Sequence, residues 1–321
     1  RRIALVTPAR PRRDLVGAGI VLAAAACFAT LGPLSEFAHR GGVGSLTLVA
    51  WRVVLGASTV SLVLLTAGLS GRGSGFVSLR SFPARDLRWV VAATVANAFL
   101  NLSVFIAFQR AGIVLTLLIF YLYPAWVALA SVAWFGERFD RTRWVALAMS
   151  LAGSVLVVAG AGSLGTLDGL GVALAFVAGI GQTFYVLAAR HGYTGIPAAQ
   201  AVVMTMSGAA LIYILLALFF TGAATLLEPT RSFGGLWPVL LAGIIGAAVP
   251  TYLYISGVRR LGAPTAAILA TFEPVVGVTL AAVLLGERPA LTQLLGGLLI
   301  IGAGILLQLR PHAETADHEA L

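Results

Sequence analysis

The sequence predicts an all-α integral membrane protein in which ten transmembrane helices form two inverted five-helix repeats. Three observations predict this fold: the apolar composition, the placement of the arginines, and a match between the two halves of the chain. Of the 321 residues, 59% are hydrophobic and 10% are charged, and the mean hydropathy is +0.97. A soluble domain has about a quarter charged residues, so this chain lacks the polar surface that water requires. Soluble globular proteins and disordered chains are therefore excluded.

Ten apolar stretches, bounded by Arg, Gly or Pro, are each long enough for a membrane helix of about 20 residues. They leave no room for a folded soluble domain. Only the connections 70–86 and 222–235 are long, and the first begins with a flexible Gly/Ser-rich segment. In chain order the stretches are 15–34, 46–69, 87–107, 113–135, 144–161, 170–189, 198–221, 236–256, 266–285 and 291–309.

The first stretch follows a basic segment, residues 1–13, but it lacks a cleavage-site pattern and is predicted to be a membrane helix rather than a signal peptide. Cys27 is the only cysteine, which excludes disulfides within the chain and cysteine-based zinc sites. We expect no metal site and no cofactor.

The positive charge is distributed by side of the membrane. All 21 basic residues are arginine, and with ten helices 16 of them fall on the side of the N-terminus, 4 on the other side, and Arg52 within the second stretch. A wrong helix count would scramble this bias, which predicts that both termini are cytoplasmic. We expect a multi-pass protein of a bacterial inner membrane, whose charge serves orientation and not nucleic-acid binding.

The two halves of the chain match at an offset of 150 residues. Five helices is an odd number, so the second half is expected to be upside down relative to the first, as in secondary transporters. The expected units are a first repeat over 14–161, a second over 168–309, and a cytoplasmic tail over 310–321. The matching segments are Arg110-Ala111-Gly112 with Arg260-Leu261-Gly262, Tyr123-Pro124 with Glu273-Pro274, and Gly136-Glu137-Arg138 with Gly286-Glu287-Arg288.

These same motifs carry a family resemblance. The segment from Phe272-Glu273-Pro274-Val275 through Leu285-Gly286-Glu287-Arg288 to Gly296-Gly297 and Gly304 resembles the end of an EamA domain, and Tyr121-Leu122-Tyr123-Pro124 through Gly136-Glu137-Arg138 resembles the end of another. The chain is thus similar to the ten-helix drug/metabolite transporter superfamily, which includes YddG-like exporters of aromatic amino acids. The resemblance implies a central cavity lined by helices 1–4 and 6–9, with helices 5 and 10 peripheral.

Two charged residues, Arg52 and Glu273, lie well inside predicted spans, where a charge costs a few kcal/mol. Pro274, directly after Glu273, and Pro124 in the fourth stretch each remove an amide donor and should break their helices. Glu273 could bind the amino group of a solute or a coupling proton. Alternatively, it could cap a neighbouring helix or pair with Arg52, because buried carboxylates usually have structural partners.

Other polar side chains are candidates for the cavity wall. Arg52 could bind a substrate carboxylate, pair structurally or reach the interface, and Asn97 and Asn101 share a helix face that could bond a solute or another helix. The candidate substrate-binding residues are Arg52, Asn97, Asn101, Tyr123, Gln182, Tyr185, Thr251, Tyr252 and Glu273, with Pro124 and Pro274 as helix breaks.

The sequence favours a secondary carrier over an enzyme. The spans contain no catalytic cluster, and without a single lysine there is no nucleotide-binding loop. We expect an alternating-access exporter of amino acids or other small aromatic or amphipathic metabolites, with a passive channel, an intramembrane enzyme, or a carrier of sugar-type or drug-like solutes as alternatives. The partners expected are the solute, the bilayer and a coupling proton, and the face of helices 5 and 10 could contact either lipid or a second copy of the chain.

Overall fold

A computed structural model describes residues 14–70, 75–160, 162, 168–286 and 288–309. Within these residues ten helical segments are long and apolar enough to cross a membrane, and there is no β-strand. The ten predicted spans are therefore confirmed. The basic segment 1–13 and the predicted tail 310–321 lie outside the described residues.

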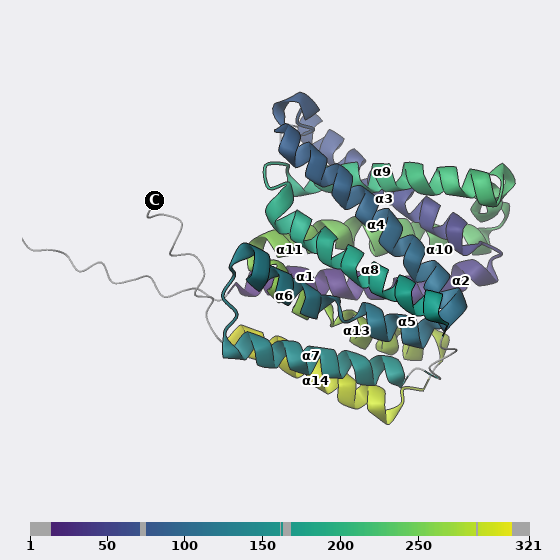
Figure 1. Ribbon diagram of the computed structural model, residues 1–321. Coiled ribbons are helices and arrows are strands. Elements are labelled where there is room, and N and C mark those ends of the chain that lie inside the picture. Colours follow the sequence, from purple (N-terminus) through teal and green to yellow (C-terminus); the bar gives the residue numbers. More distant parts are fainter. Residues whose placement is uncertain (1–13, 71–74, 161, 163–167, 287, 310–321) are drawn as a thin grey trace, which may run out of the picture.

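Several spans consist of more than one helix (Figure 1). The first half contains α1 (Leu15–Ala29) with α2 (Leu31–Arg40), α3 (Ser45–Leu69), α4 (Ala84–Ala111), α5 (Ile113–Phe120) with α6 (Tyr123–Phe135), and α7 (Arg141–Ala159). The second half contains α8 (Gly169–Leu187) with the π-helical turn Ala188–Gly192, α9 (Ala198–Phe220), α10 (Phe233–Gly243) with the π-helical turn Ile244–Ala248 and α11 (Val249–Leu261), α12 (Ala263–Ala270) with α13 (Glu273–Leu280) and the π-helical turn Ala281–Leu285, and α14 (Leu291–Leu309).

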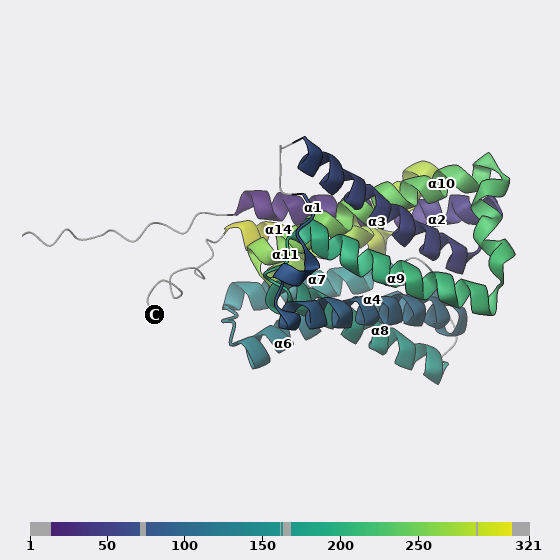
Figure 2. The ribbon, with the colours of Figure 1, turned by 90° about the horizontal axis from the view of Figure 1, so that it is seen from above.

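The first helix α1 begins, and the last helix α14 ends, at the same face of the molecule, on the left in Figures 1 and 2. We call this the terminal face, and the opposite one the distal face. The first span is longer than the sequence predicted, because the chain turns at Thr30 and continues as α2 to Arg40. The Thr30 hydroxyl donates to the Cys27 carbonyl at 2.7 Å and so stays satisfied at this turn.

The two halves repeat the same local conformations. Asp14 and Asp168 cap their helices in the same way, each accepting a hydrogen bond at 2.8 Å from the amide three residues later. The repeat is also visible in glycines with positive φ, a conformation that other residues rarely adopt. Equivalent pairs are Gly112 and Gly262, at 80° and 87°, and Gly136 and Gly286, at 66° and 73°.

Helices of the two halves pack together in equivalent pairs. The first helix of each half packs along the third span of the other, α1 against α11 and α4 against α8. Both contacts are close at a glycine: a Cβ added to Gly17 would lie 2.8 Å from the Leu261 Cδ2, and one added to Gly171 would lie 2.8 Å from the Ala111 Cβ and 2.9 Å from the Ala111 backbone nitrogen. The positions 111 and 261 are 150 residues apart, so the close contact is itself repeated.

Each of these helix pairs also carries an Asp–Arg ion pair at one end. Asp14 meets Arg260 at 2.6 Å at the terminal face, and Asp168 meets Arg110 at 3.2 Å at the distal face. The two capping aspartates therefore join the halves at opposite faces, as an inverted repeat requires.

The remaining spans also pair across the halves. α3 packs against α9, and α7 packs against α14 along one edge of the bundle (Figure 1). In the second pair the backbones nearly touch, because a Cβ on Gly153 would lie 2.6 Å from the Gly296 carbonyl oxygen. Small residues at such contacts let membrane helices approach closely. The α7–α14 pair stands at the periphery and leaves the centre to the other eight spans.

Candidate functional site

A cavity of about 220 Å³ lies between the two halves of the bundle. Its wall combines two charged side chains with amides, hydroxyls and aromatic rings. The lining residues are Phe28, Leu31, Arg52, Val53, Asn97, Leu100, Asn101, Phe120, Tyr123, Gln182, Tyr185, Thr205, Met206, Ala209, Gly246, Ala247, Thr251, Tyr254 and Glu273.

Two broken helices place side chains in this cavity. α5 ends at Phe120 and α6 begins at Tyr123; in the second half α12 ends at Ala270 and α13 begins at Glu273. Pro124 and Pro274 stand in the first turns of α6 and α13, where a missing amide hydrogen costs nothing. The break brings Tyr123 and Glu273, equivalent positions of the two repeats, to the cavity wall.

Arg52, on α3, is oriented by an asparagine from the neighbouring helix α4. Its Nη2 donates to the Asn101 Oδ1 at 3.2 Å. The Asn101 Nδ2 donates in turn to the backbone oxygen of Asn97 at 2.8 Å, one turn earlier on α4. The Arg52 Nε is buried and has no hydrogen-bond partner among the described residues. Arg52 therefore brings a positive charge to the cavity wall, and its Nε lacks a hydrogen-bond acceptor among the described residues.

Glu273 lies in the same cavity, at the start of α13. The helix has no side-chain N-cap, and among the described residues Glu273 forms no hydrogen bond and no ion pair, with Arg52 or any other residue. The two structural alternatives that the sequence left open for this carboxylate, a helix cap and a pair with Arg52, are thus not seen. The cavity contains one positive and one negative group that do not neutralise each other by direct contact.

Aromatic rings form part of the cavity wall. The Phe28 and Tyr254 rings meet edge to face with centroids 6.4 Å apart, and the Phe120 and Tyr123 rings are 5.6 Å apart. Tyr123, Tyr185 and Tyr254 are at most 5% exposed, so they are packed into the wall. Such rings give an apolar solute surface to stack against.

Nine side chains were predicted from the sequence to line the cavity, and Tyr252 does not line it. Its neighbour Thr251 lines the cavity, and successive residues of a helix point about 100° apart, so Tyr252 points away and is 42% exposed. The other eight line the cavity. Sequence reasoning did not propose Tyr254, although it lies three residues after Thr251 on the same face, nor the apolar residues Phe28 and Met206, which carry no polar signal.

At the terminal face Arg259, near the end of α11, holds the connection between α8 and α9. Its Nη1 and Nη2 donate to the carbonyls of Ile196 and Tyr193 at 2.7 and 3.0 Å, and its Nε donates to the Ala189 carbonyl at 3.3 Å. Its guanidinium also lies 5.5 Å from the centre of the Tyr193 ring. Tyr193 is fully buried. Burial raises its pKa well above the usual range, so the side chain stays neutral.

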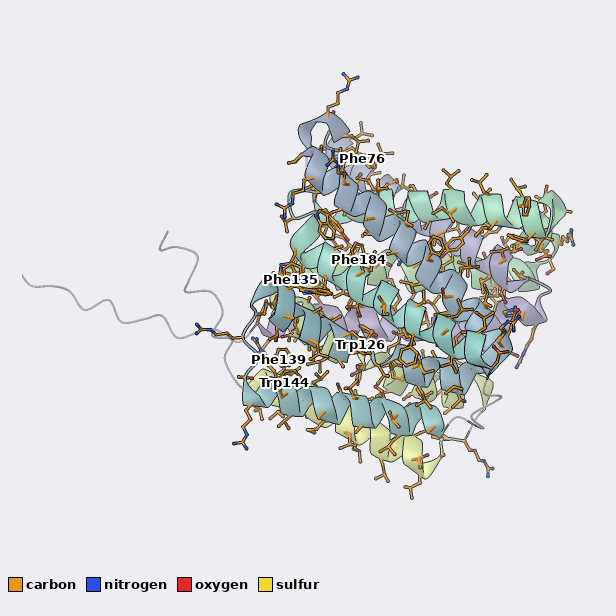
Figure 3. All side chains as sticks on the ribbon, viewed as in Figure 1. Phe76, Trp126, Phe135, Phe139, Trp144 and Phe184 are labelled. Atoms are coloured by element: carbon orange, nitrogen blue, oxygen red, sulfur yellow. The ribbon has the colours of Figure 1, made fainter. Side chains whose placement is uncertain are left out.

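Further contacts hold the same connection. The His191 ring stacks on Phe135, with centroids 3.8 Å apart, and its Nε2 lies 3.2 Å from Glu137. On α4, Asp86 accepts a hydrogen bond from the Gly195 amide at 2.9 Å. Figure 3 labels Phe135 at the terminal end of the bundle. The α8–α9 connection is therefore fixed to three spans at once.

At the distal face, Asp168 and Arg110 form the ion pair described above, and both side chains are partly exposed. The Gly171 amide, with the Arg110 guanidinium as a weaker contribution, lowers the pKa of Asp168. The hydrogen bond from the Gly171 amide therefore favours the ionised form of this carboxylate.

Comparison with known proteins places this architecture in a family. The model of the EamA-like transporter family matches residues 15–159 and again residues 169–309. The chain belongs to the EamA-like transporter family. The two matched segments are the two structural repeats described above.

Two curated relatives are named as transporters. An uncharacterized transporter of Archaeoglobus fulgidus is 27% identical over 74% of this chain and 83% of its own length. The uncharacterized transporter YxxF of Bacillus subtilis is 25% identical over 76% of this chain and 77% of its own length. A crystal structure of a protein, 22% identical, shares the fold with a TM-score of 0.77 over 94% of this chain and 99% of the other. This EamA-like chain is a multi-pass membrane protein of the transporter class.

Proposed function

We propose that the protein is a secondary carrier that exports amino acids and related small aromatic or amphipathic metabolites by alternating access. The observation that carries the proposal is the charge arrangement of the cavity: Arg52 and Glu273 line one space of about 220 Å³ without an ion pair between them. Buried charges are costly unless partnered. A zwitterion would supply a carboxylate to Arg52 and an ammonium group to Glu273.

The size and chemistry of the cavity favour this class over the alternatives. Pockets for drug-sized ligands are about 300–1,000 Å³, so a cavity of about 220 Å³ suits a smaller solute. A phosphate or nucleotide-sugar cargo calls for several cations, and Arg52 is the one arginine among the lining residues. The aromatic residues of the wall suit an apolar side chain on the solute.

The inverted repeat supports alternating access. Two halves of equal fold can exchange their conformations, so that one packing opens the cavity to one face and the other packing opens it to the opposite face. The arginine bias supports an orientation with the terminal face in the cytoplasm of a bacterial cell. Export and proton coupling through Glu273 complete the proposal.

The test is flux into proteoliposomes that contain the purified protein, over a panel of amino acids, with and without a pH gradient. We expect saturable uptake of aromatic amino acids and acceleration by unlabelled solute on the other side, which a passive channel does not give. If no solute of the panel moves faster than in empty vesicles, the proposal is wrong.

Coupling is tested separately with Glu273→Gln, which keeps the shape of the side chain but cannot ionise. We expect this variant to lose the response to a pH gradient and to exchange solute with a raised KM, because the ammonium group of the solute loses its charged partner. Normal gradient-driven transport by Glu273→Gln would remove the coupling role.

A further inference from the structure

We propose that Asn101 determines the charge class of the solute, because it positions Arg52 without neutralising it. This inference rests on the proposed function and specifies which residue sets the preference for a solute that bears a carboxylate.

The Arg52 guanidinium has an unusual partner for its place inside the bundle. A buried arginine is ordinarily paired with a carboxylate. Here the Arg52 Nη2 donates instead to an amide oxygen, the Asn101 Oδ1, at 3.2 Å, and Arg52 forms no ion pair among the described residues. An amide oxygen accepts a hydrogen bond but carries no net charge. Asn101 therefore fixes the direction of the guanidinium and leaves its positive charge available.

The oxygen of the Asn101 amide, and not its nitrogen, faces Arg52. The Asn101 Nδ2 donates to the backbone oxygen of Asn97 at 2.8 Å. A backbone carbonyl can only accept, and a guanidinium can only donate, so both neighbours require the same orientation of the amide. The asparagine is thus held at both ends, and an acceptor always faces Arg52.

The bond to Asn101 leaves the positive charge of Arg52 available to a ligand in the cavity. The Arg52 Nε is buried and unpartnered among the described residues, and Arg52 lines the cavity. An unsatisfied buried donor is costly and usually indicates a missing partner. A solute carboxylate in the cavity would compensate the positive charge of Arg52.

The chemistry predicts a switch. In Asn101→Asp a carboxylate would take the place of the amide oxygen that already contacts Arg52, and the internal ion pair would cancel the positive charge. Glu273 would then be the uncompensated charge among the cavity residues, which favours a solute that has an amino group and no carboxylate. The new carboxylate would thus repel a solute that carries a carboxylate and leave Glu273 to attract a solute that carries only an amino group.

The experiment compares two probes that share a ring and an amino group, phenylalanine and phenethylamine, in proteoliposomes that contain the full chain. For the wild type we expect a lower KM for phenylalanine. For Asn101→Asp we expect the ratio of the two kcat/KM values to move toward phenethylamine by about 10- to 100-fold, the range for loss of a hydrogen bond between charged groups.

Two further variants separate positioning from a general defect. Asn97→Asp adds the same charge one turn away, at a side chain that forms no hydrogen bond with Arg52 among the described residues, and should change the ratio less. Asn101→Leu removes the acceptor without adding charge, and should raise the KM for phenylalanine more than the KM for phenethylamine.

The outcomes are distinct. An unchanged ratio in Asn101→Asp, with transport of both probes intact, overturns the inference. If Asn101→Asp cannot be purified folded, Asn101→Leu decides: an equal loss for both probes overturns the inference. If the wild type transports neither probe nor any amino acid, it is the proposed function that fails.

Discussion

The two broken helices differ in how their halves are buried, and the difference follows the face of the membrane rather than the repeat. α12, the half of its span near the terminal face, has all eight residues buried. Its repeat equivalent α5 stands near the distal face and has one buried residue, Thr116. Conversely α6, near the terminal face, has six buried residues, while its equivalent α13 has none. Equivalent sequences thus adopt different environments.

Within these two spans, the halves near the terminal face are therefore packed more tightly than the halves near the distal face. α12 and α6 contact each other on the closed side. An inverted repeat in which one face is closed is one end state of the alternating mechanism proposed above. The opposite state would give α5 and α13 the burial that α12 and α6 have here.

One repeat position makes different contacts at the two faces. Arg259 makes three hydrogen bonds to the α8–α9 connection. The residue 150 positions earlier is Gln109, which is exposed at the distal face. A neutral amide cannot reproduce the charge-assisted bonds of a guanidinium. Position 109 therefore has no counterpart of the Arg259 clamp, and the bonds that join the halves at the distal face come from other residues, such as the Gly44 amide to Glu228 Oε2 at 2.9 Å and the Trp51 Nε1 to the Leu226 carbonyl at 2.8 Å.

The largest effect should come from Arg259→Gln, which gives the terminal face the residue of the distal face. Loss of hydrogen bonds from a charged group should cost the closed state about 2 kcal/mol, or roughly a 30-fold shift of the equilibrium toward opening at the terminal face. The measurement is thiol labelling of a cavity cysteine from the terminal side. Unchanged labelling would show that the clamp does not hold the face closed.

The next effect should come from overfilling the closed half. Ala267, in α12, is fully buried, and its repeat equivalent in α5 is the half-buried Leu117. Ala267→Leu should destabilise the closed state by about 1–3 kcal/mol, because the packed contact cannot accept the larger side chain. The reciprocal change Leu117→Ala, at the looser face, serves as the control and should have a smaller effect on thermal unfolding in detergent. Equal effects would mean that the two faces are packed alike.

The smallest effect should come from the two exposed ion pairs that join the halves. Asp14→Asn and Asp168→Asn keep a side chain that can cap the helix but lose its charge, so each should lower the unfolding temperature slightly and by a similar amount. Asp168→Ala, which removes the cap as well, should cost more. A large and unequal pair of effects would contradict the equivalence of the two joints.

The contribution of Asp168 should also depend on pH in one direction. Its pKa is lowered in the folded protein, so its charged form stabilises the fold above the ordinary pKa of aspartate, about 3.9, and this stabilisation is lost as the pH falls through the lowered value. The difference in unfolding temperature between wild type and Asp168→Asn should therefore be present at neutral pH and disappear on acidification. A difference that grows at low pH would contradict this assignment.

The fold was predictable because hydropathy, arginine placement and the 150-residue offset each constrain the chain as a whole. The polar cavity residues were predictable one by one, since a polar side chain inside a span needs a reason. Tyr252 was misassigned because position along a helix does not give the direction of a side chain unless the face is known. The clamp by Arg259 was not predictable, because its partners are backbone carbonyls of another segment and leave no mark in the sequence. The closed terminal face is a property of packing, and both end states share one sequence.

The asymmetry of the two faces is tested most directly by cysteine accessibility at one repeat position. Phe120, at the end of α5, lines the cavity, whereas its equivalent Ala270, at the end of α12, is 8% exposed. In a Cys27→Ser background, Phe120→Cys and Ala270→Cys each give a protein with one thiol. A membrane-impermeant thiol reagent should label the Phe120→Cys protein from the distal side and leave the Ala270→Cys protein unlabelled from both sides, until Arg259→Gln opens the terminal face. Equal labelling of the two positions from the distal side would contradict the closed terminal face on which this account depends.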